Sequence, residues 1–187
     1  MAQPIRLIGI AGSLRRGSHN RALLAALAPL LPNDARLTIF DGLAEIPLYD
    51  ADVEAKGLPP AVVALRQSIA EADGLVIATP EYNAGVPGVL KNALDWISRP
   101  PAPRPLFGKP VDILGATPGK GTTAAAQTQL RQTLVATGAP CMPAPTVRLS
   151  QVALLFDAEG RLTDEPTREL LTGYAAALHR WVERLAS

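Results

Sequence analysis

The 187-residue sequence lacks three features that would indicate a secreted, a membrane-spanning or a nucleic-acid-binding protein. It has a single cysteine, Cys141, which excludes an intrachain disulfide and suits a reducing compartment. It has no apolar run long enough to cross a bilayer and no charged-then-apolar leader. It has no excess of one charge, since the net charge is +1, which argues against a broad nucleic-acid or membrane surface. We therefore expect a cytoplasmic globular protein with neither nucleic acid nor membrane as partner.

Several catalytic motifs are also missing. No G-x-G-x-x-G follows the first apolar run, and there is no G-x-S-x-G, H-E-x-x-H or C-x-x-C. The stretch "GATPGKGTT" (115–123) looks like a phosphate-binding P-loop, but its glycine spacing differs and Lys120 is followed by glycine rather than Ser or Thr. These absences argue against a dinucleotide fingerprint, a nucleotide hydrolase, a serine hydrolase and a metal centre.

Short apolar runs alternate with amphipathic segments along the chain. Runs that are apolar on both faces are typical of buried parallel strands, and their alternation with helices predicts a doubly wound α/β fold. The predicted strands span residues 5–12, 35–43, 74–80, 109–116 and 144–150, and the predicted helices 19–31, 59–73, 86–98, 122–138 and 164–185. Five prolines between Pro100 and Pro110 predict a stiff connector. One flavodoxin-like domain over residues 1–187, with parallel sheet order 2-1-3-4-5 and helices on both faces, fits better than an eight-unit barrel.

In that order the loops after the first and third strands meet at the carboxyl edge, where such sheets bind ligands. The first loop, "GSLRRGSHN" (12–20), stands between a strand and a helix whose free N–H groups and dipole favour an anion. Ser13, Ser18 and Asn20 add donors, and Arg15 adds charge. Capping of the helix by Ser18 or Asn20 is the alternative, but one cap explains one residue and the loop carries four donors.

The second loop, "TPEYNAGVPGVLKNALDW" (79–96), supplies the identification. Together with the first loop it closely resembles the NADPH-dependent FMN reductase family, in the branch of quinone and chromate reductases. That family has G-S-L-R-x-x-S-x-N after strand one and P-E-Y-N-x-x-x-P-x-x-L-K-N-x-x-D-W after strand three, and both patterns are present almost unbroken. The resemblance extends from Ile5 to about Trp181 and is weakest after Ser150.

The resemblance implies an FMN-dependent oxidoreductase with NADPH or NADH as co-substrate. Electrons would pass to a small-molecule acceptor (a quinone, azo compound, metal oxyanion or free flavin) by a ping-pong mechanism, in a homodimer or possibly a tetramer. Ser13, Arg15, Ser18 and Asn20, with His19 in the same loop, would hold the phosphate. The isoalloxazine would lie against the second loop and the segment after strand four, in contact with Pro80, Glu81, Tyr82, Asn83, Gly85, Ala116, Thr117, Pro118 and Gly119. No side chain is obliged to act as acid or base, so no catalytic residue is predicted.

Some features leave alternatives open. Tyr82 could be a packed core aromatic, and Glu81 could cap a neighbouring loop. Ala125 and Thr128 stand where the family often has an arginine and a tyrosine that join two dimers, which weakens the expectation of a tetramer. A flavodoxin-type electron carrier and a sensor for another phosphorylated ligand remain as rival functions. The sequence alone decides neither the physiological acceptor nor the preference between NADPH and NADH, although Arg15 and Arg16 could favour a 2′-phosphate.

Overall fold

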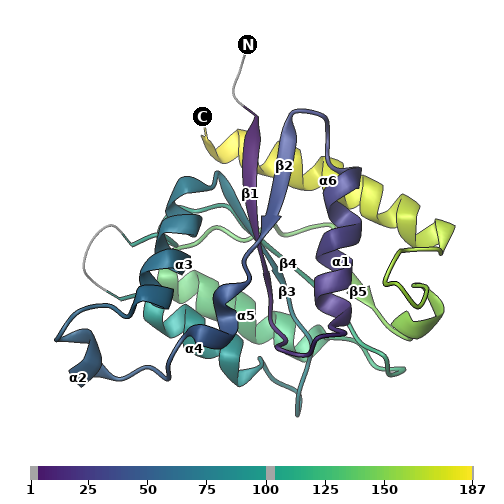
Figure 1. Cartoon of the computed structure of the whole chain (residues 1–187). Coiled ribbons are helices and arrows are strands. Elements are labelled where there is room, and N and C mark those ends of the chain that lie inside the picture. The colour runs from purple at the N-terminus through teal and green to yellow at the C-terminus, as the bar shows by residue number, and fades with distance from the viewer. Residues whose placement is uncertain (1–3, 100–103, 187) are drawn as a thin grey trace.

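Five parallel strands form one sheet in the order β2-β1-β3-β4-β5, which confirms the predicted order and the flavodoxin-like fold (Figure 1). The computed structural model describes residues 4–99 and 104–186, so the start of the proline-rich connector, residues 100–103, lies outside the described residues. The strands are β1 (Ile5–Ala11), β2 (Ala35–Ile39), β3 (Gly74–Ala78), β4 (Val111–Ala116) and β5 (Val147–Leu149).

Helices cover both faces of this sheet. They are α1 (His19–Leu27), α2 (Ala51–Glu54), α3 (Pro60–Glu71), α4 (Gly88–Ile97), α5 (Ala124–Thr137) and α6 (Glu165–Ala186). The helices α1 and α6 pack on one face, and α3, α4 and α5 pack on the other (Figure 1). Within the described ranges, no helix combines the length and the hydropathy of a transmembrane span.

The sequences of the central strands are apolar without interruption because both faces of these strands are buried. Every residue of β3 is buried, and its side chains alternate between two cores. Leu75 and Ile77 pack with α3, α4 and α5, whereas Val76 and Ala78 pack with α1 and α6. Because full burial of one such aliphatic side chain contributes about 1.5–3 kcal/mol, this strand anchors both layers.

Two predicted elements end four residues earlier than the sequence pattern indicated, for local reasons. The helix predicted for residues 19–31 is α-helical only to Leu27, and residues Ala28–Leu30 form a tighter 3-10 turn. Pro29 lies in that turn and lacks the N–H that another α-helical turn would need. The strand predicted for residues 35–43 ends at Ile39, and Gly42–Glu45 form a second 3-10 turn. Gly138 ends α5 with φ +73°, the left-handed conformation in which a glycine commonly ends a helix.

A buried polar cluster lies where β4 faces α6. Asp112, within β4, has a side-chain exposure of 0%, and the hydroxyl of Tyr174 from α6 is close by. The guanidinium of Arg131 from α5 lies 3.9 Å from its carboxyl oxygen Oδ1. Burial raises the pKa of Asp112 to about 7, although the Tyr174 hydroxyl, a backbone N–H and the Arg131 charge act in the opposite direction.

Arg131 also reaches the cysteine of the chain. Its Nη1 donates to the Cys141 sulfur at 3.0 Å and to the carbonyl oxygen of Met142 at 2.7 Å. Cys141 is half-buried rather than a full core residue. Burial raises the pKa of its thiol to about 11, with the Arg131 charge opposing that rise.

The buried carboxyl makes stability depend on pH in a defined window. Between about pH 4 and pH 7 the Asp112 carboxyl is ionised in the unfolded chain but keeps its proton in the folded one. The free energy of unfolding should therefore fall as pH rises through this window, by up to roughly 4 kcal/mol from this group. Asp112→Asn should flatten that fall, as measured by urea unfolding at pH 5 and pH 8. An equal fall in the variant and the wild type would contradict the assignment.

Candidate active site

The loops after β1, β3 and β4 meet at the carboxyl edge of the sheet and enclose a pocket of about 170 Å³. Its lining comes from all three loops and consists of Ser13, Arg15, Ser18, His19, Asn20, Pro80, Glu81, Tyr82, Ala116, Thr117 and Pro118. Every one of these residues was predicted from the sequence. Three other predicted residues, Asn83, Gly85 and Gly119, are not in the lining and lie next to it in the chain.

The start of α1 offers free donors to this pocket. Ser18 is the N-cap, since its hydroxyl accepts the N–H of Arg21 at 3.2 Å. The first hydrogen bond of the helix runs from the N–H of Ala22 to the carbonyl of Ser18. Among the described residues, the N–H groups of His19 and Asn20 have no acceptor. The capping interpretation is thus confirmed for Ser18, and two backbone donors remain for an anion.

The rest of the first loop adds positive charge at the same point. The Oγ of Ser13 accepts the N–H of Arg15 at 3.4 Å, and the Arg15 guanidinium donates to the carbonyl of Gly17 at 2.5 Å. The loop thus folds back on itself and holds Arg15 near the beginning of α1. Burial and the charge of Arg15 both lower the pKa of His19, so its imidazole is neutral at pH 7. The local field at the start of α1 therefore favours an anion.

Asn20 has a different role from the donor that the sequence predicted. Its side chain is 2% exposed and its amide is engaged on both sides by the end of β4. The carbonyl oxygen of Ala116 accepts from Nδ2 at 3.0 Å, and the N–H of Ala116 donates to Oδ1 at 2.9 Å. The Asn20 side chain therefore joins the first loop to β4, while its backbone N–H faces no described acceptor.

The second loop ends in a tight hairpin at Tyr82–Gly85. The N–H groups of Tyr82 and Gly85 donate to each other's carbonyls at 3.2 and 3.0 Å. The two residues between them, Asn83 and Ala84, have φ values of +51° and +57°, a conformation that costs a non-glycine residue roughly 1–2 kcal/mol. Tyr82 is 56% exposed, so the interpretation of Tyr82 as a core aromatic is wrong. The N–H of Gly85 is used within the hairpin, and those without a described acceptor belong to Asn83 and Ala84.

Helix α5 supports this hairpin through two side-chain contacts. The carboxylate of Glu81 accepts the N–H of Ala126 at 3.0 Å, so Glu81 acts as a cap, but it caps the start of α5 rather than a neighbouring loop. Gln129 holds the other end: its Oε1 accepts the N–H of Val86 at 3.1 Å, and its Nε2 donates to the carbonyl of Ala84 at 3.2 Å. No sequence pattern indicates a role for Gln129, because the contact joins segments more than 40 residues apart.

The third side of the pocket follows β4. The N–H of Thr117 donates to the carbonyl of Leu149 at 2.9 Å, and the carbonyl of Gly119 accepts the N–H of Gln151 at 2.9 Å, so this loop is tied to the segment after β5. At Gly115 the chain has no room for a side chain, since a Cβ would lie 2.6 Å from the carbonyl oxygen of Thr79. Neighbouring strand ends can approach this closely only with glycine here.

Fold and site together define a class of protein: a flavodoxin-like domain in which a helix start with unpaired N–H groups lies beside a partly exposed hairpin. Comparison with known proteins gives the family. The family model for NADPH-dependent FMN reductases matches residues 5–153, and the chain belongs to that family. It is therefore an oxidoreductase of the kind that uses FMN and takes electrons from NAD(P)H.

Relatives and solved structures agree with this membership over nearly the full length. An NAD(P)H-dependent FMN reductase of Pseudomonas aeruginosa is 48% identical over 185 residues, 99% of each chain. A quinone reductase of Escherichia coli K12 is 40% identical over 187 residues, again 99% of each chain. The structure of FerB, a flavoenzyme NAD(P)H:(acceptor) oxidoreductase from Paracoccus denitrificans, superposes with a TM-score of 0.88 at 32% identity, covering 96% of this chain and 98% of FerB.

The inward position of Asn20 generates a prediction about stability. Asn20→Ala would leave the buried N–H and C=O of Ala116 unpaired, at about 1–3 kcal/mol for each group. Urea unfolding of the FMN-free protein should show a loss of roughly 2–4 kcal/mol. Addition of FMN should restore only part of it, because the first loop would also be released from β4.

Asn92 provides a matched control, since its amide also bridges backbone groups, those of Pro47 and Tyr49, away from the pocket. Asn92→Ala should destabilise the protein while leaving FMN affinity within about twofold of the wild type. An Asn20→Ala variant with wild-type unfolding and weak FMN binding would instead show that the side chain acts on the cofactor.

Proposed function

We propose that this chain is a cytoplasmic NAD(P)H:quinone oxidoreductase that holds FMN in the pocket at the carboxyl ends of β1, β3 and β4. The observation that carries the proposal is the convergence of the three predicted loops on one pocket with unpaired N–H groups at the start of α1. The name of one relative, quinone reductase, supports this class of acceptor, and the name of another, NAD(P)H-dependent FMN reductase, supports the flavin and the electron donor.

The residues present fit FMN in its chemistry and in their layout. A phosphate needs several N–H donors and a cation, which the backbone of His19 and Asn20, the hydroxyl of Ser13 and the guanidinium of Arg15 can supply. The pocket, at about 170 Å³, is smaller than a typical ligand site of roughly 300–1,000 Å³. We therefore assign the phosphate end of the cofactor to the pocket and its ring system to the exposed surface of the hairpin.

The hairpin gives the ring system a fixed set of donors. The N–H groups of Asn83 and Ala84 would donate to the carbonyl-bearing edge of the ring, with Pro80 and Tyr82 at its side. When bound, FMN supplies the redox chemistry, taking a hydride from the nicotinamide and passing electrons to the acceptor. Backbone donors held at that edge stabilise negative charge there without having to reorient during the reaction. The contact of Glu81 with the start of α5 and the contacts of Gln129 from α5 keep these donors in place.

The acceptor and the assembly belong to the same proposal. The lining offers no free pair of acid and base, since its carboxylate, Glu81, is engaged as a cap of α5. Donor and acceptor therefore need only reach the same exposed surface beside Tyr82.

We also propose a homodimer, as the family resemblance implies. Ala125 and Thr128 are short, and the Thr128 hydroxyl already donates to the carbonyl of Ala124, so they favour a dimer over a tetramer.

The assignment of the phosphate can be tested with riboflavin, which lacks it. Each hydrogen bond to a charged group contributes about 1.5–3 kcal/mol, so riboflavin should bind at least about 100-fold more weakly than FMN. Arg15→Ala should lower FMN affinity and leave riboflavin affinity unchanged, as measured by quenching of flavin fluorescence. Equal affinities for the two flavins would refute the phosphate site. A flavin-loaded protein that does not oxidise NAD(P)H would be an electron carrier instead.

Shared use of one surface predicts the kinetic pattern. If donor and acceptor take turns at the same place, initial rates at varied NAD(P)H and several fixed quinone concentrations should give parallel double-reciprocal lines. High quinone should then inhibit competitively against NAD(P)H. Intersecting lines would show that both bind together, and the ping-pong mechanism would be wrong while the FMN assignment stood.

A further inference from the structure

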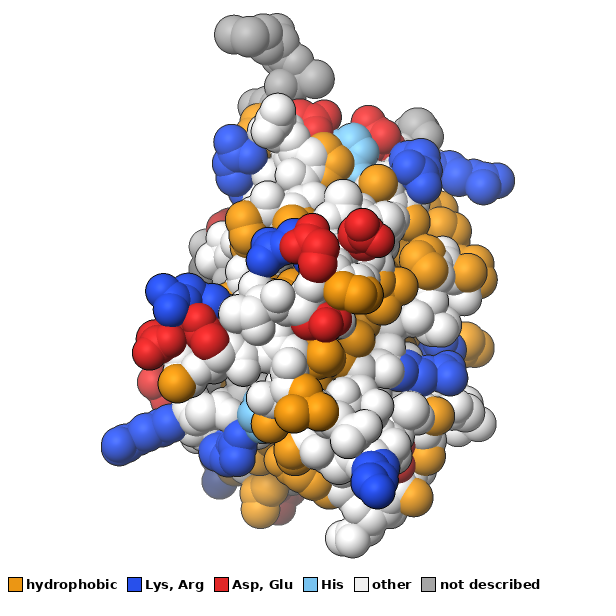
Figure 2. Space-filling view, turned by 90° about the vertical axis from the view of Figure 1, so that its right-hand side faces the viewer, with side chains coloured by type: hydrophobic (Ala, Val, Ile, Leu, Met, Phe, Trp, Pro, Cys, Tyr) orange, Lys and Arg blue, Asp and Glu red, His pale blue; other side chains and the backbone are white. Residues whose placement is uncertain are grey.

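A cluster of three side chains that can bind metal ions lies at the amino edge of the sheet, opposite the FMN pocket. Asp34 immediately precedes β2, and His179 and Glu183 belong to α6. One ligand atom from each of the three lies within 4.8 Å of the others. Figure 2 shows acidic side chains on either side of a histidine at the top of the face drawn there. The proposed function makes no use of this cluster.

The backbone brings the three residues together. The carbonyl of Asp34 accepts the N–H of Ile5 at 2.7 Å, so the turn that carries Asp34 is held against the start of β1. His179 and Glu183 are four residues apart in α6, a spacing that places both side chains on one face of the helix. No sequence motif indicates the cluster, because Asp34 is distant from the other two along the chain.

The imidazole of His179 stands between the two carboxylates. Its Nε2 lies 3.0 Å from Oδ1 of Asp34, and its Nδ1 lies 3.2 Å from Oε2 of Glu183. A neutral imidazole carries one N–H, so it can donate to one carboxylate only and turns a lone pair toward the other. Within the described residues, no lysine or arginine pairs with either carboxylate. One more positive charge is therefore needed between the ring and the second carboxylate.

The unsatisfied nitrogen of this ring is Nε2. His179 is 9% exposed, and its Nε2 is buried without a hydrogen-bond partner in the part of the chain that the structure describes. Since Oδ1 of Asp34 is nevertheless 3.0 Å away, it lies to the side of the N–H direction rather than along it. Two ligands of one zinc ion, at bond lengths of about 2.0–2.2 Å, lie roughly 3.3 Å apart in the same sideways relation. The pair therefore resembles two ligands of one ion more than a donor and its acceptor.

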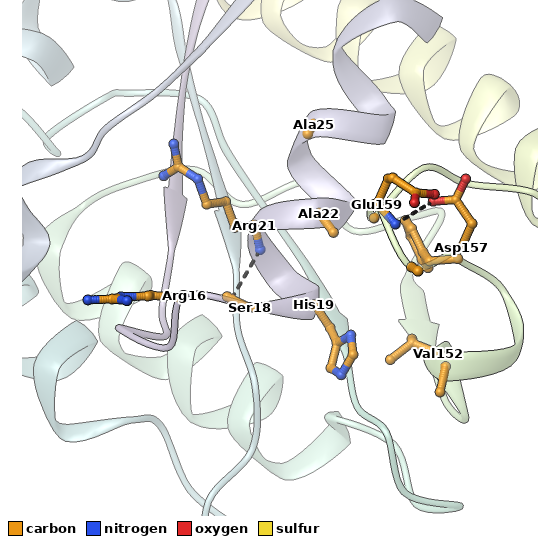
Figure 3. A pocket seen from close by; sticks show the side chains of 14 residues that line it. Arg16, Ser18, His19, Arg21, Ala22, Ala25, Val152, Asp157 and Glu159 are labelled. Atoms are coloured by element: carbon orange, nitrogen blue, oxygen red, sulfur yellow. Dashed lines mark hydrogen bonds between the residues drawn. The ribbon is translucent and has the colours of Figure 1, made fainter.

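The other histidine of the chain has no such surroundings. His19 lies in the hollow between the start of α1 and the segment that follows β5 (Figure 3). The carboxylates of Asp157 and Glu159 in the same hollow are already bound by Arg161, at 2.7 and 3.0 Å. Burial and the charge of Arg15 lower the pKa of His19, and the same charge opposes a metal ion beside it. A metal ion is therefore expected at His179 and not at His19.

We propose that Asp34 and His179 bind a divalent transition-metal ion such as Zn²⁺, with water completing its coordination. Glu183 would accept the Nδ1–H of His179, and such a carboxylate–histidine–metal arrangement fixes which ring nitrogen is free for the ion. An imidazole nitrogen beside a carboxylate oxygen suits Zn²⁺, whereas Mg²⁺ and Ca²⁺ prefer oxygen ligands alone. The bound ion would connect α6 to the turn before β2 and so stabilise the fold at a distance from the flavin.

The test measures binding of Zn²⁺ to the tag-free, FMN-loaded protein by equilibrium dialysis against ZnCl₂ at neutral pH, with MgCl₂ as the comparison. His179→Gln and Asp34→Asn each remove one proposed ligand, and Glu183→Gln removes only the carboxylate that orients the ring. Asp95→Asn is the matched control, because that carboxylate also lies at the surface but already pairs with Lys91. Thermal unfolding of every protein is recorded with and without ZnCl₂, and the scans without ZnCl₂ show whether each variant is folded.

We expect one Zn²⁺ per chain with a Kd below about 100 µM. The midpoint of thermal unfolding should rise by at least about 5 °C when free Zn²⁺ exceeds the Kd about a hundredfold. Both effects should be lost in His179→Gln and Asp34→Asn and unchanged in Asp95→Asn, and Glu183→Gln should weaken binding about 10- to 100-fold. Mg²⁺ should produce neither effect.

Two results would overturn the inference. If the wild type bound no Zn²⁺, the cluster would be an ion pair around a protonated histidine, which needs no metal ion. If binding survived in His179→Gln, the ion would lie elsewhere on the protein. Neither result bears on the proposed function, because the cluster lies at the edge of the sheet away from the FMN pocket.

Discussion

The pair of hydrogen bonds between the amide of Asn20 and the backbone of Ala116 is the contact on which the site depends. It connects the beginning of α1 to the end of β4, across the carboxyl edge of β3. Because both partners are buried, water cannot replace either bond without cost. The unpaired N–H groups at the start of α1 are therefore held at a fixed place relative to the loops after β3 and β4. Without this contact the N–H groups at the start of α1 would still be unpaired, but they would not be held beside the loops after β3 and β4.

The same principle explains the hairpin. Asn83 and Ala84 adopt backbone angles that an isolated chain avoids, and residues outside the hairpin keep them there. Glu81 and Gln129 connect the turn to α5, which is itself packed on the sheet. The protein thus contributes few reacting side chains, and most of the contacts at the site hold backbone donors in place. That division suits a protein in which a cofactor carries the electrons.

The fold was largely predictable because its signal is periodic and local. The unbroken apolar runs of β3 and β4 follow from burial on two faces, and Gly138 marks the end of α5 through its own backbone geometry. The site was predictable as a set of loops but not in the roles of its members. Whether Asn20 points at a ligand or at Ala116, and whether Glu81 faces a flavin or a helix start, depends on segments distant in sequence. The role of Gln129 was not predictable for the same reason. The turn at Ala84 was not predictable because alanine is not a residue type that indicates a left-handed turn.

The partial burial of Cys141 has a consequence for its reactivity toward quinones. Quinones are electrophiles as well as oxidants, and a thiolate near them adds to the ring and is arylated irreversibly. A thiol with a pKa of about 11 has almost no thiolate at neutral pH, and half-burial hinders access to it. The one sulfhydryl of this chain is thereby kept in its unreactive form. A protein proposed to meet quinones at every turnover would thus resist alkylation by its own substrates.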